Sequence, residues 1–142
     1  MEELEKERAE YLAGWQRAKA DLLNYKKEEK ERLQGFLQYA NEAFLLKLLP
    51  IVDNLERAEK EVEKDNNRVV QGFLQIGKQL RDFLKKQGVE EMRAQGEKFD
   101  PEFHEAVGEA EGAKSGYIKE VVEKGYKVKD TLLRPAKVKV GK

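Results

Sequence analysis

The sequence is poor in the side chains that enzymes most often use for covalent or metal chemistry. It contains no cysteine, one serine (Ser115), one threonine (Thr131) and one histidine (His104). The lack of cysteine excludes disulfides, thiol nucleophiles and thiolate metal sites. With so few hydroxyl and imidazole groups, a nucleophilic Ser–His site has almost no material. His104 paired with a nearby carboxylate is the one acid–base arrangement left to consider.

Long apolar runs and an excess of charge of one sign are also missing. No apolar segment approaches the roughly 20 residues that span a bilayer, and the N-terminal sequence MEELEKERAE is too acidic for a signal or transit peptide. The 28 basic and 28 acidic residues cancel, which argues against a protein that coats nucleic acid. We therefore expect a cytoplasmic protein without membrane or nucleic-acid partners.

The first third of the chain is predicted to be one long helix. From Met1 to about Lys47 there is no proline, and good helix formers dominate. Apolar residues recur at an eleven-residue spacing, at Tyr11, Leu22, Leu33 and Phe44. This period favours two near-parallel helices with little left-handed supercoil. Residues 1–48 are therefore predicted to form a stalk helix that pairs with a second copy.

Residues 49–87 are predicted to form two short helices. Pro50, in the apolar segment FLLKLLPIV, is expected to break or kink the first helix, which resumes from Asp53. A turn around residues 65–67 precedes a second amphipathic helix, Val69–Lys86, and Gly88 is placed to cap its end. Two such helices cannot bury their apolar faces alone, whereas a dimer would make a four-helix bundle.

The composition changes after Gly88. Seven of the eleven glycines lie from residue 88 onward, and short β-prone segments alternate with turn residues. Residues 88–142 are predicted to form a small all-β domain with strands near Val89–Met92, Glu105–Ala110, Tyr117–Val122, Tyr126–Lys129 and Ala136–Val140. The fold class predicted for the whole chain is therefore α+β.

The only histidine lies in the motif GEKFDPEFHEAV. Asp100 and Pro101 form a good start for a turn or helix, because Asp accepts hydrogen bonds from free amides and Pro presets φ. His104 has no second histidine at a useful spacing for a metal ion. We interpret Asp100 and His104 as structural residues, with no metal, no catalytic residue and no cofactor.

A basic and aromatic segment lies on the predicted stalk helix. Asn24-Tyr25-Lys26-Lys27 is followed by Lys30 and Arg32, but three glutamates interrupt it. Nucleic-acid binding is an alternative, but a solvated helix surface or a protein-binding face fits the mixed charge better.

An ordered set of motifs runs through the chain. LLPIVDNLERA precedes the Gly88-Val89-Glu90 junction, then GEKFDPEFHEAV, and finally GYKVKDTLLRPAKVKV. In this order the sequence resembles the GrpE family, the nucleotide-exchange factors of DnaK-type heat-shock chaperones, from roughly Leu22 to Val140.

The resemblance implies a parallel homodimer with a two-helix stalk, a four-helix bundle and one small β-domain per subunit. It also implies a co-chaperone rather than an enzyme, with no small-molecule substrate of its own. In this family a β-domain docks on the nucleotide-binding domain of the chaperone and opens the cleft, so that ADP leaves. The alternative is a coiled-coil scaffold or adaptor whose β-domain binds another protein without nucleotide exchange.

The resemblance also assigns roles to individual positions. Those implied to contact the chaperone are Lys26, Lys27, Arg57, Phe99, Pro101, Val122, Arg134, Pro135 and Val140. Those implied to be structural are Pro50, Gly72, Gly88, Asp100, His104 and Gly125, of which Gly72 matches a closely packed position. Two departures concern the stalk contacts: Glu28 stands where many relatives carry a basic residue, and Gly35 where some carry lysine.

Overall fold

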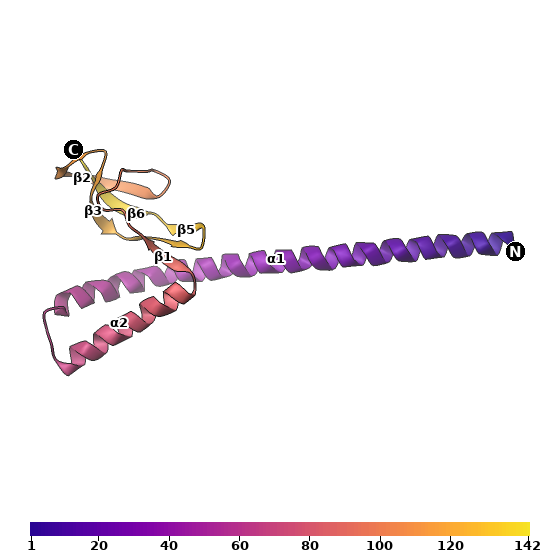
Figure 1. The fold of residues 1–142 in the computed structure, drawn as a ribbon, viewed down its shortest axis with the longest axis horizontal. Helices are drawn as coiled ribbons and strands as arrows, with labels where there is room; N and C mark the ends of the chain where they lie inside the picture. The colour runs from indigo at the N-terminus through magenta and orange to yellow at the C-terminus, as the bar shows by residue number, and fades with distance from the viewer. The chain divides into compact units, whose positions relative to one another are not determined.

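The computed structural model describes all residues from 1 to 142. Two helices are followed by six strands (Figure 1). By its internal contacts the chain divides into two compact units, an N-terminal unit of residues 1–41 and a C-terminal unit of residues 42–142. The α+β class, the long N-terminal helix and the small β part near the C-terminus are confirmed.

Helix α1 spans Glu2–Val62 and passes through Pro50, so a break at this proline is wrong, whereas a kink there stays a prediction. Proline in a helix interior costs about 3 kcal/mol, because one backbone hydrogen bond is lost and the ring crowds the preceding turn. Around Pro50, however, Leu45, Leu49 and Val52 are almost completely buried. Each buried aliphatic side chain contributes roughly 1.5–3 kcal/mol, so their packing outweighs the proline penalty.

Helix α2 spans Arg68–Lys86 and lies beside the C-terminal part of α1 within the C-terminal unit (Figure 1). It begins where the sequence predicted a turn: the side chain of Asn67 accepts a hydrogen bond from the amide of Val70 at 2.9 Å. It ends before Gly88, whose φ of +85° is a left-handed conformation that favours glycine.

The first sheet has the order β1–β4–β5 and is antiparallel throughout. Its strands are β1 Val89–Met92, β4 Gly125–Val128 and β5 Thr131–Arg134. One apolar core joins this sheet to both helices; it contains Leu45, Leu49, Val52, Leu84, Val89, Tyr126 and Val128. The sheet is therefore held on the helices by a shared core.

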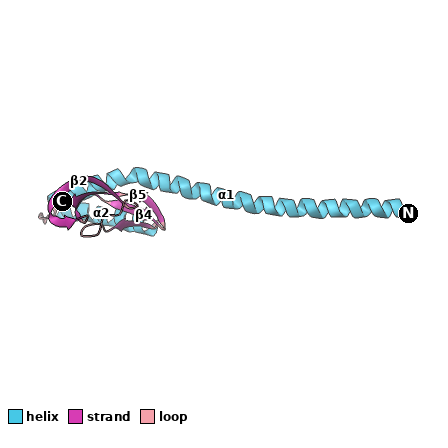
Figure 2. Ribbon diagram, turned by 90° about the horizontal axis from the view of Figure 1, so that it is seen from above, coloured by secondary structure: helices cyan, strands magenta, loops and turns pink.

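The second sheet has the order β2–β6–β3, in which β2 is parallel and β3 antiparallel to the central strand β6. Its strands are β2 His104–Ser115, β3 Ile118–Glu123 and β6 Ala136–Gly141. A separate small core of Ala94, Ile118, Ala136 and Val138 lies here, with Phe99, Val121 and Val140 packed against it. Figure 2 shows the strands gathered with α2 and the end of α1 in the C-terminal unit.

Gly125 and Gly72 differ in how closely other atoms pack around them. At Gly125 a Cβ atom would lie 2.6 Å from the backbone nitrogen of Ala136, so only glycine fits between β4 and β6. Gly72 has no neighbour within 4 Å of such an atom, so close packing at Gly72 does not occur within the single chain. The closely packed Gly72 that the resemblance implies stays a prediction.

No helix carries an apolar stretch long enough to cross a membrane.

Candidate functional site

A groove runs between the end of α1 and strand β3 in the C-terminal unit. Its volume is about 380 Å³. We call it the α1–β3 groove, and its lining residues are Asp53, Glu56, Arg57, Lys60, Val121, Val122, Glu123, Lys124 and Lys137. The groove brings together Arg57 and Val122, two residues that the sequence analysis assigned to chaperone contact.

The exposed side chains of the groove combine one apolar residue, Val122, with positive charge. Val122 is 53% exposed although it is a β-branched aliphatic residue. The Arg57 side chain is exposed and donates to the Asn54 side chain at 3.1 Å. Lys60 follows three residues later on α1, which places it on the same helix face.

The acidic side chains of the groove are already paired. Glu56 binds Lys124 at 3.0 Å, and Glu123 lies 3.8 Å from Lys137. Asp53 accepts from Arg134 at 2.7 Å. Since Arg57 and Lys60 have no carboxylate partner within the chain, the groove offers unneutralised positive charge beside an apolar side chain.

Arg134 lies behind the groove and is largely buried. Its side chain is only 11% exposed. Nη2 donates to Asp53 of α1, Nε donates to the carbonyl of Lys124 at 2.8 Å, and Nη1 lies 3.7 Å from Glu123 of β3. Burial on its own lowers the pKa of Arg134, but the hydrogen bond and charge of Asp53 outweigh it and the pKa is raised. The guanidinium therefore stays charged between the two walls.

Tyr126 packs against the same guanidinium, with the Arg134 carbon 5.4 Å from its ring centroid. It is 6% exposed. Burial is the main cause of its raised pKa, and the carboxylates of Glu56, Glu91 and Asp53 raise it further while Arg134 opposes them. The phenol is therefore held in its neutral form.

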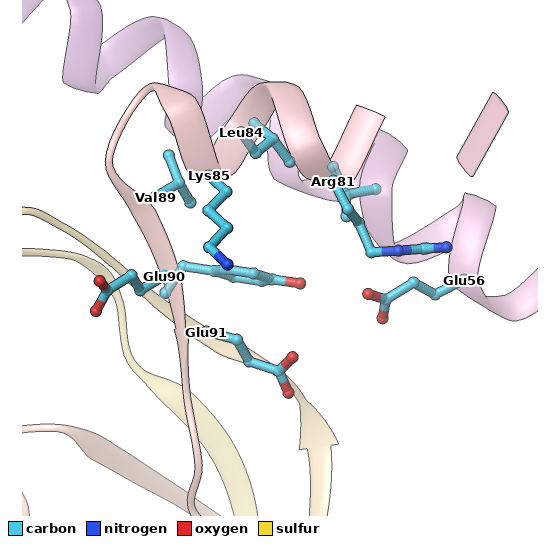
Figure 3. A pocket seen from close by; sticks show the side chains of 9 residues that line it. Glu56, Arg81, Leu84, Lys85, Val89, Glu90 and Glu91 are labelled. Atoms are coloured by element: carbon cyan, nitrogen blue, oxygen red, sulfur yellow. The ribbon is translucent and has the colours of Figure 1, made fainter. Parts of the chain in front are cut away.

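A second cavity of about 380 Å³ is lined by Tyr126 and by residues of α1, α2 and β1. Figure 3 shows Glu56, Arg81 and Glu91 reaching the same space from these three elements. Lys124 lies 3.0 Å from Glu56 and 3.5 Å from Glu91. Burial by itself lowers the pKa of Lys124, but the two glutamates outweigh it and the pKa is raised. Glu56 of α1 and Glu91 of β1, which both line this cavity, are thus joined through Lys124.

The remaining candidate residues lie elsewhere. Phe99 and Val140 are half-buried against the small core of the second sheet, and Pro101, two residues after Phe99, is exposed. Pro135 is half-buried between β5 and β6. Lys26 and Lys27 are exposed on α1 in the N-terminal unit. None of these six lines the α1–β3 groove.

His104 is buried in a local turn. Its Nδ1 accepts from the amide of Asp100 at 3.0 Å, and its own amide donates to the Asp100 carbonyl at 2.9 Å. The Asp100 carboxylate in turn accepts from the amide of Glu102 at 3.0 Å. Nδ1 is thus occupied as an acceptor, and the centroid of the imidazole ring lies 6.0 Å from that of the Phe99 ring. The imidazole therefore stabilises the turn.

Sequence reasoning missed three lysines of the groove, Lys60, Lys124 and Lys137. Lys60 could have been found from its spacing after Arg57 on one helix face. Lys137 alternates with the buried Ala136 and Val138, so a strand pattern places it outward. Nothing local marks Lys124, because its partners Glu56 and Glu91 are distant in sequence.

Comparison with known proteins decides the family. The family model described as GrpE matches residues 1–142. The chain belongs to the GrpE family. It is 48% identical to Protein GrpE of Alkaliphilus oremlandii over 99% of this chain and 81% of that protein. It is 40% identical to Protein GrpE of Geobacillus kaustophilus, covering 97% of this chain and 67% of that protein. Protein GrpE of Bacillus subtilis is also 40% identical, over 87% of this chain and 68% of that protein.

Proposed function

We propose that this chain is a homodimeric co-chaperone that accelerates ADP release from a DnaK-type chaperone. It docks on the nucleotide-binding domain and favours the open cleft. The observation that carries this proposal is the α1–β3 groove in a chain of the GrpE family, because the groove joins Arg57 and Val122. Its chemistry suits a partner with an acidic patch beside an apolar one.

The mechanism is a coupling between two ligands of one partner. This protein binds the open cleft better than the closed one, and ADP binds the closed cleft better. Each ligand therefore lowers the affinity of the chaperone for the other ligand by the same factor. For such couplings the factor is typically about 5- to 150-fold. The protein needs no catalytic residue for this role.

The proposed dimer is supported by the apolar side chains that the single chain leaves exposed. In the N-terminal unit every residue is exposed except the half-buried Glu29; Tyr11 is 76%, Trp15 59% and Phe36 65% exposed. In α2 the residues Val69, Ile76 and Phe83 recur every seventh position and are also exposed. Exposed apolar faces of this extent mark an interaction surface.

We propose that residues 1–48 pair as a parallel stalk and that residues 49–87 join those of a second copy in a four-helix bundle. Residues 88–142 then form the β-domain of each subunit. Lys26, Lys27, Phe99, Pro101, Pro135 and Val140 are proposed as further chaperone contacts outside the groove.

Calorimetric titration of the chaperone's nucleotide-binding domain tests the proposal. The domain is titrated with this protein once without nucleotide and once saturated with ADP. We expect this protein to bind the ADP-saturated domain more weakly than the nucleotide-free domain. The factor should equal the factor by which this protein lowers the affinity of the domain for ADP. Equal affinity for both forms would favour the alternative, an adaptor that binds without nucleotide exchange.

A further inference from the structure

We propose that Arg134 is a positioning residue that fixes the two walls of the α1–β3 groove, rather than a residue that contacts the chaperone. The evidence for this role is the geometry of the Arg134 side chain. The effect of this role on chaperone binding rests on the proposed function. We call Arg134, Asp53, Glu123 and the carbonyl of Lys124 the clasp.

The clasp spans the groove from wall to wall. Asp53 lies on the α1 wall and Glu123 on the β3 wall, and both line the groove. Arg134 itself lies on β5, outside the lining, yet it is 2.7 Å from Asp53 and 3.7 Å from Glu123. A planar guanidinium presents its donors in a rigid fork, so it can hold partners in two directions at once.

Burial separates this role from direct contact. An arginine that binds a partner protein needs its guanidinium accessible, but this side chain is 11% exposed and all its nitrogens face groups of its own chain. Arg57 is the contrast, because its side chain is exposed on the groove. Tyr126 covers one face of the Arg134 guanidinium and limits its movement.

Without the clasp, little apolar packing would set the separation of the walls. The core that joins helix and sheet lies on β1 and β4, whereas β3 belongs to the second sheet with its own small core. The ion pairs of Glu123 and Asp53 through Arg134 are therefore a direct link between α1 and β3. The relative position of Arg57 and Val122 depends on this link together with the ion pair of Glu56 and Lys124 at 3.0 Å.

The test measures the separation of α1 and β3, the two elements that form the walls of the groove. Since the chain has no cysteine, Glu61→Cys on α1 and Lys119→Cys on β3 can carry a pair of nitroxide labels at exposed positions. Doubly labelled chains are diluted in unlabelled chains so that pairs within one chain dominate the dipolar signal. We expect one narrow distance for the parent protein and a distribution about twice as wide for Arg134→Met.

Arg81→Met is the matched control. It removes an arginine that binds Glu59 of α1 through two hydrogen bonds at 2.9 and 3.0 Å, but Arg81 does not reach the groove. Its distance distribution should match that of the parent. If Arg134→Met fails to fold, Asp53→Ala releases the α1 wall alone, and the same broadening is expected.

Binding to the chaperone completes the test. Arg134→Met should bind about tenfold more weakly with a broadened distance, whereas Arg57→Ala should bind more weakly with the narrow distance retained. An unchanged distance in both Arg134→Met and Asp53→Ala would overturn the clasp. If the parent protein does not bind the chaperone, the proposed function fails, while the distance measurement still decides the clasp.

Discussion

Arg57 of α1 and Val122 of β3 line the same groove, although helix and strand belong to different structural layers of the C-terminal unit. One supplies an exposed charge and the other an exposed apolar side chain.

Val122→Asp should weaken chaperone binding strongly. A buried apolar residue near the centre of an interface often contributes about 2 kcal/mol, which corresponds to roughly 30-fold in Kd. The control is Val107→Asp on β2, since Val107 is 46% exposed compared with 53% for Val122 and does not line the groove. Equal losses of chaperone affinity in the two variants would show that the groove is not part of the binding site.

Gly125→Ala should destabilise the fold, because the new methyl group meets backbone that cannot move aside. Overpacking of this kind costs about 1–3 kcal/mol. Gly35→Ala is the opposite case: nothing lies within 4 Å, and the change favours helix by about 1 kcal/mol. Denaturant unfolding followed by circular dichroism measures both, and a neutral Gly125→Ala would contradict the close approach of β4 and β6.

Ile76→Glu should dissociate the proposed dimer by placing a charge in the exposed apolar stripe of α2. Lys78→Glu on the same helix changes an already polar exposed position and should leave the dimer intact. Sedimentation equilibrium at several concentrations separates the outcomes. A parent protein that is monomeric at every concentration would refute the four-helix bundle.

Alkaline pH should destabilise the protein through Tyr126 and Lys124. Both have a raised pKa in the folded state. For Tyr126 the unfolded chain loses its proton near the ordinary value of 10.0, whereas the folded chain retains it. For Lys124 the folded chain likewise retains a proton above the ordinary value of 10.5. Stability from both groups is therefore complete below about pH 10 and falls as the pH rises further.

Tyr126→Phe removes the tyrosine part of this dependence. The midpoint temperature of thermal unfolding of the Tyr126→Phe variant should fall less between pH 9 and pH 11 than that of the parent protein. Absorbance titration of the phenolate gives a second measurement, in which one of the five tyrosines should ionise only with unfolding. Ionisation of all tyrosines in the folded protein near pH 10 would contradict the burial of Tyr126.

Much of the fold follows from local patterns in the sequence. The long α1, the start of α2 at Asn67 and strand β1 all lie where composition and turn residues predict them. Pro50 misled the prediction, because the burial of Leu45, Leu49 and Val52 that carries the helix through it is tertiary. Strand β5 was missed since TLLR is short, ends beside Pro135 and pairs only with β4.

The candidate site could be predicted only in part. Arg57 and Val122 came from the resemblance to the family, but their shared groove depends on the packing of β3 near α1. The resemblance to the family also implied that Arg134 contacts the chaperone. Its burial depends on Asp53, which is separated from it by 81 positions, and no local pattern connects an acid and a base so far apart.

The release of labelled ADP from a DnaK-type chaperone, followed by stopped-flow fluorescence with and without this protein, tests the central claim most directly. At saturating protein we predict release faster by about tenfold or more, in keeping with a coupling above about 1.4 kcal/mol. Val122→Asp should lose most of this acceleration at the same concentration. An unchanged release rate with the parent protein at saturation would contradict the proposed function.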